Sequence, residues 1–220
     1  MRKEEEMGNF GANIDFLDKV KLLDKKQKIL EIGSGMGGII NYLKNKGYKI
    51  QGIEPNQEYI KGARQKYGNL PIKQMSGDNL KFKDKTFDIV LSFDVFEHIK
   101  DTDKHLQEVR RVLQDGGFYI FSTPNKLTNI PWEILNKRSL AKWKEYHVAL
   151  HTYWQLKRRL SKHGFLINFV DISIMNDVVF NKIKSKLGKF GLFLFKKINP
   201  DKFPLALRTN FYVAGERYVE

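Results

Sequence analysis

The 220-residue sequence contains no cysteine. This excludes disulfide bonds, thiolate nucleophiles and zinc sites built on thiolate ligands. Long apolar runs are also missing: the run at residues 191–195 is far shorter than the roughly 20 residues of a membrane-spanning helix. The charged residues 1–6 have no apolar core and therefore do not resemble a signal peptide. We expect a cytoplasmic protein.

Acidic residues are scarce relative to basic ones. The chain has 25 Asp and Glu against 39 Lys and Arg, which gives a formal net charge of +14. Such a charge suits an anionic partner, such as a phosphorylated substrate, a nucleic acid or an acidic membrane surface. The alternative is that the lysines are solvated and only keep the protein in solution.

Apolar segments of strand length alternate with segments of helical periodicity over the first half of the chain. This rhythm predicts an α/β fold with a doubly wound, mostly parallel sheet. Strands are expected at residues 28–32, 49–53, 71–75, 86–92 and 118–122, with a tight turn at 115–117. Helices are expected at residues 13–23, 39–45, 56–67 and 102–113.

The second half changes in character. Residues 123–150 are expected to form a long polar and aromatic connection. A helix is predicted at 153–163 with Trp154, Leu156 and Leu160 facing inward. Strands at 165–174 and 209–219 flank a basic, helical insertion at 176–208, and these two strands are expected to pair antiparallel. The fold prediction is one seven-stranded domain with an antiparallel last strand. It has a lead-in at 1–27, a cofactor-binding core at 28–125, and lid or substrate insertions at 126–150 and 176–208.

A glycine turn follows the first strand. Gly33, Gly35 and Gly38 let a ligand approach the backbone closely, and the helix behind them begins with free N–H groups and a positive dipole end. The spacing also fits a dinucleotide-binding turn. Glu31 favours a different ligand, because a carboxylate there would repel a pyrophosphate but attract an ammonium group. The alternative is that Glu31 is a solvated strand end.

Polar residues follow the other predicted strands at the edge where ligands bind in such sheets. Glu54 ends the second strand, where a carboxylate can accept bonds from both ribose hydroxyls. Asp78 follows the third strand, where an acid can accept a bond from an adenine amino group. Residues 92–98 end the fourth strand, and residues 123–125 end the fifth.

Five segments in order resemble class I S-adenosylmethionine-dependent methyltransferases of the type 11 and type 12 group. They are ILEIGSGMGG (29–38), GIEPN (52–56), GDNLKF (77–82), FDIVLSFDVFEHI (87–99) and RRVLQDGGFYIFSTPN (110–125). The resemblance implies S-adenosylmethionine as cofactor and S-adenosylhomocysteine as product. It places the amino-acid end of the cofactor at Glu31, Gly33, Ser34, Gly35 and Gly37. It further places the ribose at Glu54, the adenine at Pro55, Asp78 and Asn79, and the sulfonium at Ser92 and Phe93.

His98 is the first candidate for proton transfer, since it follows the fourth strand near the expected methyl group. The alternative is a histidine that only orders the loop. His147 and His151 are four residues apart, so in a helix they would share one face. They are a metal pair or, as we favour, polar lid residues. The set Asp94, Glu97 and His98 resembles the metal-binding stretch of ubiquinone-pathway O-methyltransferases, but we predict no resident divalent metal.

Four aromatic residues can line a substrate pocket or pack as lid and core: Trp132, Trp143, Tyr146 and Trp154. The segment 182–197 is basic and amphipathic, which suits peripheral contact with an anionic membrane or, alternatively, a lid. We expect methyl transfer to oxygen or nitrogen of a small-molecule or lipid- or saccharide-linked, anionic acceptor. The alternatives are an RNA methyltransferase, a non-catalytic nucleic-acid binder and an NAD-dependent oxidoreductase. Oligomeric state is not predicted.

Overall fold

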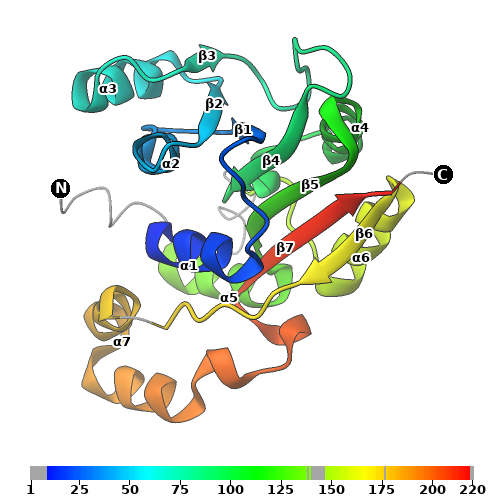
Figure 1. Cartoon of the computed structure of the whole chain (residues 1–220). Helices are drawn as coiled ribbons and strands as arrows, with labels where there is room; N and C mark the ends of the chain where they lie inside the picture. The colour runs from blue at the N-terminus through cyan, green and yellow to red at the C-terminus, as the bar shows by residue number, and fades with distance from the viewer. Residues whose placement is uncertain (1–8, 138, 140–146, 176, 219–220) are drawn as a thin grey trace.

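The computed structural model describes residues 9–137, 139, 147–175 and 177–218. Its centre is a seven-stranded sheet with the order β3-β2-β1-β4-β5-β7-β6 (Figure 1). Neighbouring strands from β3 to β5 pair parallel, whereas β7 pairs antiparallel with both β5 and β6. The predicted fold class, including the antiparallel last strand, is therefore confirmed. The strands are β1 (Lys28–Ile32), β2 (Lys49–Glu54), β3 (Ile72–Gln74), β4 (Phe87–Phe93), β5 (Leu113–Pro124), β6 (Phe165–Phe169) and β7 (Asn210–Arg217).

Helices cover both faces of the sheet, because alternate residues of each strand point to opposite sides. On one face, α1, α2 and α3 pack on a layer that contains Ile29. On the other face, α4 and α6 pack on a layer that contains Leu30. Within α4, Leu106, Val109 and Val112 are fully buried, as predicted. The α-helices are α1 (Phe10–Val20), α2 (Gly38–Asn45), α3 (Gln57–Tyr67), α4 (Thr102–Val112), α5 (Lys126–Lys137), α6 (Tyr153–Lys162) and α7 (Asp177–Ile198). Short 3-10 helices are η1 (Phe96–His98), η3 (Pro200–Lys202) and η4 (Leu205–Leu207).

Several boundaries differ from the predictions. Helix α1 begins and ends three residues earlier than expected, and it ends where Lys21 adopts a left-handed conformation. Strand β5 begins at Leu113, directly after α4, so residues 115–117 are not a separate turn. The register with β4 shifts between Phe87 and Ile89, which makes this stretch a bulge inside the strand. Strand β6 ends at Phe169, five residues earlier than predicted.

The largest correction concerns the connection after β5. It contains the helix α5, which forms although Pro131 lies inside it, whereas the sequence predicted only a long polar and aromatic connection. The predicted helix after it forms as α6, with Leu156 and Leu160 fully buried, but Trp154 is 61% exposed and does not face inward. The helical insertion before the last strand is confirmed as α7. None of the helices within the described ranges is long and apolar enough to cross a membrane.

Candidate active site

The glycine turn between β1 and α2 has the backbone geometry that only glycine adopts easily. Gly33, Gly35 and Gly37 have φ values of 70°, 48° and 80°. A Cβ on Gly33 would lie 2.3 Å from a Val95 methyl, whereas a Cβ on Gly35 would meet nothing within 4 Å. The turn is therefore packed against the protein at its first glycine and faces open space at its second.

That open space belongs to a cavity of about 690 Å³ at the carboxyl ends of β1 and β4. Five of the predicted cofactor residues line it: Glu31, Gly33, Ser34, Gly35 and Phe93. The others are not among its lining residues: Gly37, Glu54, Pro55, Asp78, Asn79 and Ser92. The sheet thus brings one end of the expected cofactor site together around a cavity, and the ribose and adenine positions lie outside this cavity.

Glu31 is the polar group of this cavity with the most unusual environment. Its side chain is only 4% exposed, so the solvated alternative is wrong. Its Oε2 atom has no hydrogen-bond partner within the described part of the chain. Burial, assisted by the charge of Glu54, raises the pKa of Glu31 to about 8. A buried carboxylate with an unsatisfied oxygen is costly, and a cationic ligand in the cavity would remove that cost.

The predicted ribose ligand, Glu54, supports the turn in the structure. Its two carboxylate oxygens accept hydrogen bonds from the backbone N–H groups of Gly35 and Asn56, each at 2.9 Å. Asn56 caps α3, as expected from the sequence, by accepting a bond from the N–H of Glu58. Glu54 therefore links the glycine turn to the start of α3, while each carboxylate oxygen keeps a further lone pair for a ligand hydroxyl.

The remaining predicted positions lie around the same edge of the sheet. Asp78 accepts a hydrogen bond from Ser76 Oγ, and Asn79 Oδ1 accepts one from Lys81 Nζ at 2.9 Å. Pro55 is exposed, and Ser92 is fully buried within β4. The assignment of these residues to adenine and sulfonium stays a prediction.

A polar cluster also lines the cavity, and sequence reasoning singled out only its member Asp94. Asp94 has a left-handed backbone (φ 53°), and its carboxylate accepts bonds from Ser122 Oγ at 3.2 Å and Asn9 Nδ2 at 3.5 Å. Asn13 lies on the buried face of α1, and its Oδ1 accepts from Ser122 Oγ at 3.4 Å. Burial raises the pKa of Asp94, against the effect of these bonds. The feature of the sequence that could have indicated this cluster is Asn13, a polar residue on the face of α1 that also carries Phe16 and Leu17.

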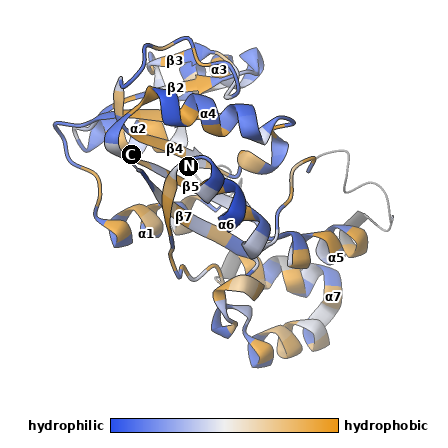
Figure 2. Ribbon diagram, turned by 90° about the vertical axis from the view of Figure 1, so that its right-hand side faces the viewer, coloured by the Kyte–Doolittle hydropathy of each residue, from blue (hydrophilic) through white to orange (hydrophobic). Residues whose placement is uncertain are grey.

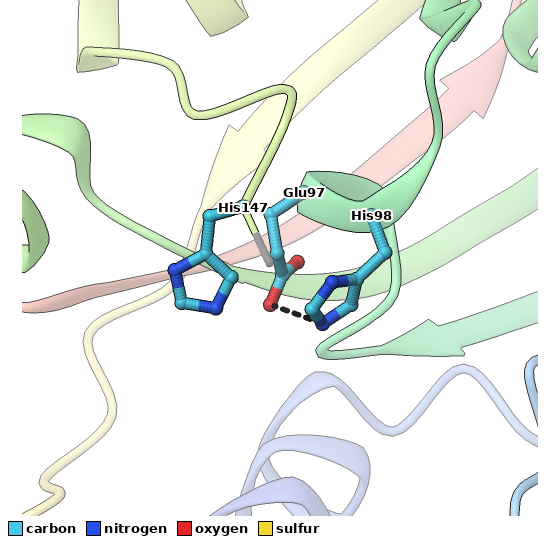
Figure 3. Close-up of side chains that lie close together, drawn as sticks. All are labelled: Glu97, His98 and His147. Atoms are coloured by element: carbon cyan, nitrogen blue, oxygen red, sulfur yellow. Dashed lines mark ion pairs between the residues drawn. The ribbon is translucent and has the colours of Figure 1, made fainter. Parts of the chain in front are cut away.

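A second group consists of Glu97 and His98 from η1 and His147, and it contains the predicted base, His98 (Figure 3). Glu97 is 2% exposed, and its Oε2 accepts a hydrogen bond from Thr123 Oγ1 at 3.0 Å. Its Oε1 lies 3.9 Å from His98 Nε2, and the ring centroids of His98 and His147 are 5.2 Å apart. Burial, followed by the charge of Asp94, raises the pKa of Glu97 to about 8. The predicted base is thus one member of a compact Glu-His-His group.

The third member of this group, His147, was expected to share a helix face with His151. Residues 147–151 are not helical, so His147 and His151 do not share a helix face. His147 instead bonds through Nδ1 to Asn129 Oδ1 at 2.9 Å, whereas His151 is buried with Nδ1 on the carbonyl of Ala149. One ligand atom from each of Glu97, His98 and His147 lies within 4.8 Å of the other two, which is the kind of set that can hold a metal ion. The prediction of no resident metal stays a prediction.

Two of the four predicted aromatic pocket residues lie within the described part of the chain. Trp154 is exposed on α6, and Trp132 is partly buried on α5. Trp143 and Tyr146 lie outside the described residues.

Comparison with known proteins identifies the cofactor-binding half. Residues 30–121 match the protein family described as "Methyltransferase domain". This segment is a methyltransferase domain. It contains the glycine turn, Glu54, Asp78 and η1, and S-adenosylmethionine is the cofactor of the class I enzymes that this domain resembles. An oxidoreductase that shares only the glycine turn does not account for this match.

Relatives of the methyltransferase domain act on different acceptors. The chain is 31% identical over 124 residues to a ubiquinone biosynthesis O-methyltransferase of Pelagibacter ubique, covering 54% of this chain and 51% of that protein. It is 31% identical over 112 residues to a fatty-acid O-methyltransferase of Mycolicibacterium smegmatis, covering 49% and 41%. The chain thus spans about half or less of the length of these relatives. A solved S-adenosylmethionine-dependent methyltransferase from Mesorhizobium loti has the same fold, with a TM-score of 0.66 at 17% identity, covering 96% and 100%.

Proposed function

We propose that this chain transfers the methyl group of S-adenosylmethionine to an oxygen or nitrogen atom of a small-molecule or lipid- or saccharide-linked acceptor. The observation that carries the proposal is the buried Oε2 of Glu31, which has no partner in the described structure and lines the cavity beside the glycine turn. A dinucleotide would bring a pyrophosphate to this turn, and its charge would be repelled by Glu31. An amino-acid ammonium group would be attracted.

The residues present fit this cofactor at its amino-acid end. Glu31 would hold the ammonium group, and Gly35 leaves open space for close approach to the turn. Glu54, with 6% of its surface exposed, would accept the ribose hydroxyls. Pro55, Asp78 and Asn79 would contact the adenine, and Ser92 and Phe93 would lie beside the sulfonium. Gly33, Ser34 and Gly37 shape the turn.

The chemistry is an in-line displacement. When bound, the cofactor supplies an activated methyl group on a positively charged sulfur. The acceptor atom would form a bond to the methyl carbon as the carbon–sulfur bond breaks, with the bonding pair left on sulfur. His98 would take the proton that the acceptor loses, since an imidazole is a suitable general base and this one follows β4, with its Nε2 atom 3.9 Å from Glu97 Oε1. The main contribution of the protein is alignment, which is worth roughly 7–11 kcal/mol at its best.

The acceptor class is supported by the named relatives and by the absence of one nucleic-acid signature. The two relatives described above are named as O-methyltransferases, one of ubiquinone biosynthesis and one of fatty acids. The sequence at the end of β4 reads Ser92-Phe93-Asp94-Val95. It lacks the Asn/Asp-Pro-Pro-aromatic motif that is typical of enzymes that methylate amino groups of nucleic acids.

The cofactor is tested by thermal unfolding of the full chain with S-adenosylhomocysteine or NAD. A ligand at about 100 times its dissociation constant stabilises the folded state by about 2.7 kcal/mol. We expect a clear rise of the melting temperature with S-adenosylhomocysteine and none with NAD; the reverse pattern would contradict the proposal. The acceptor is tested with S-adenosylmethionine labelled in its methyl group, incubated with separated lipid, small-molecule and RNA fractions of a cell extract. Label found only in RNA would overturn the acceptor class.

A further inference from the structure

The helix α7 and the turn after it expose an unusual number of large apolar side chains. Phe190 is 73% exposed and Phe193 is 60% exposed. Six such residues lie within 18 positions of sequence, and we call them the α7 apolar stripe: Phe190, Phe193, Leu194, Ile198, Phe203 and Leu207. Singly exposed apolar residues need no explanation, but a run of aromatic and aliphatic side chains on one segment marks a contact surface.

The stripe is held outward by contacts within α7. The helix bends at Gly188, which has non-helical backbone angles. A Cβ on Gly191 would lie 2.2 Å from Leu187 Cβ, so the two halves of α7 meet closely there. Lys196 Nζ lies 5.2 Å from the ring centroid of Phe180 in the first half. The inner sides of the two halves are therefore occupied, while Phe190, Leu194 and Ile198 recur at four-residue spacing on the outside.

The charge around the stripe is positive. Residues 182–208 contain seven lysines and one arginine but a single acidic residue, Asp201. The carboxylate of Asp201 is used internally, where it accepts bonds from Ser173 Oγ and from the backbone N–H of Met175. Exposed lysines flank the stripe at positions 184, 189, 197 and 202.

The segment after α7 is firmly attached to the candidate active site. Asn125, which directly follows β5, donates through Nδ2 to the carbonyls of Ala206 and Arg208 at 3.0 and 2.8 Å. Arg208 also pairs with Asp171 at 2.9 Å. Figures 1 and 2 show α7 at one end of the molecule, next to α5 and far from α3. A partner bound to the α7 apolar stripe would therefore lie next to the edge of the sheet at which β5 ends.

We propose that the α7 apolar stripe docks on a bilayer that carries anionic phospholipid headgroups. The apolar side chains enter the headgroup and acyl boundary, and the flanking lysines neutralise the headgroup charge. Charge complementarity selects this occupant: a second copy of the chain would bring another positive surface against the first. The proposal goes beyond methyl transfer, since it concerns where the enzyme works, and it does not depend on the identity of the acceptor.

The test is co-sedimentation of the full chain with vesicles of phosphatidylcholine alone or mixed with phosphatidylglycerol. We expect binding to the anionic vesicles and a tenfold or greater preference over neutral ones, with loss of binding at high salt. The double variant Phe190→Ser/Phe193→Ser should lower the vesicle affinity at least tenfold. Lys189→Gln/Lys197→Gln should lower it on anionic vesicles only. The matched control is Leu166→Ser, because Leu166 is 56% exposed on β6, away from α7.

The outcomes separate this proposal from the proposed function. Each variant is first checked for an unchanged melting temperature and for stabilisation by S-adenosylhomocysteine, so that a variant that keeps both and loses vesicle binding tests the α7 apolar stripe alone. Equal vesicle binding by the Phe190→Ser/Phe193→Ser variant and the control would overturn the proposal. A dimer in solution that this variant converts to monomer, without vesicle binding by the original chain, would also overturn it and would assign the stripe to self-association.

Discussion

The two halves of the chain build their sites in different ways. In residues 28–125, two candidate side chains are buried beside strands held in register: Glu31 is 4% exposed and Glu97 is 2% exposed. In residues 126–208, α5 and α7 place large side chains such as Phe190 and Phe193 in solvent. The sheet thus holds polar groups in buried positions, which costs desolvation free energy before any ligand binds. The later helices instead expose apolar surface.

This difference suits two tasks. Burial raises the pKa of Glu31, and a cationic ligand in the cavity would favour its charged form, so we expect Glu31 to select for an ammonium group. Exposed apolar residues with flanking lysines give adhesion with little geometric selection, as a membrane or a variable acceptor requires. His98 and Glu97 stand between the two halves, next to His147 from the later segment.

The largest effect is expected at this junction. His98→Gln should reduce turnover about 100-fold or more, because a general base is typically worth 10²–10⁴-fold, while the affinity for S-adenosylhomocysteine stays the same. The measurements are kcat with an acceptor found in the labelling experiment and calorimetric titration with the product. The matched control is His163→Gln, a histidine that pairs with Asp103 on α4. Unchanged turnover in His98→Gln would return this residue to a role in loop structure.

The same variant also tests the metal alternative. If Glu97, His98 and His147 hold a metal ion, a chelator should lower turnover, and the His98→Gln protein should retain less metal by elemental analysis. If His98 is a metal-free base, the chelator should have no effect, and kcat should instead depend on pH through one group that the variant lacks.

Glu31→Gln should weaken binding of S-adenosylhomocysteine about 10- to 100-fold, since a hydrogen bond to a charged group contributes roughly 1.5–3 kcal/mol. The measurement is calorimetric titration, with thermal unfolding of the free variant as a check on folding. The free variant should be no less stable than the original protein, because Oε2 of Glu31 has no hydrogen-bond partner among the described residues. Equal affinity would show that the ammonium group binds elsewhere.

The raised pKa of Glu31 gives this prediction a pH signature. With a pKa of about 8 when folded and the usual lower value when unfolded, the folded state binds the extra proton between these two values. Stability should therefore fall as pH rises through this interval. Glu31→Gln should flatten part of this decline in denaturant unfolding measured near pH 5 and near pH 8. An unchanged slope would assign the decline to other groups such as Glu97, whose pKa is raised in the same way.

Two glycines of the turn are expected to respond differently to substitution, because Gly33 is packed against the protein and Gly35 faces open space. Gly33→Ala should destabilise the fold by about 3 kcal/mol, because a strained backbone is combined with overpacking against Val95. Gly35→Ala should cost only about 1 kcal/mol, since its Cβ would meet nothing. The measurement is denaturant unfolding of both variants. If Gly35→Ala nevertheless weakens S-adenosylhomocysteine binding, the ligand fills the space beside this residue; equal destabilisation by both would contradict the packing difference.

The cofactor half could be predicted because its constraints are local in sequence. A buried strand, a glycine turn and a helix follow one another within residues 28–45, and the carboxyl ends of parallel strands converge on one edge. The side chains around η1 and the helices after β5 could not be predicted in this way. His147 joins Glu97 and His98 through an irregular segment, so four-residue spacing from His151 carried no information. Helix α5 formed despite Pro131, and Asp94 is fixed by Asn9 and Ser122, both distant in sequence.

The smallest effect is expected at Trp154, and helix geometry gives the reason. Leu156 and Leu160 are one turn apart and share the buried face of α6, but Trp154 precedes Leu156 by two positions, about 200° around the helix. It cannot lie on the same face, and it is 61% exposed. Trp154→Ser should therefore change the free energy of unfolding by less than about 0.5 kcal/mol. Denaturant unfolding and acceptor turnover measure this together. A large loss of turnover at unchanged stability would place an acceptor contact on α6 and move part of the acceptor site away from η1.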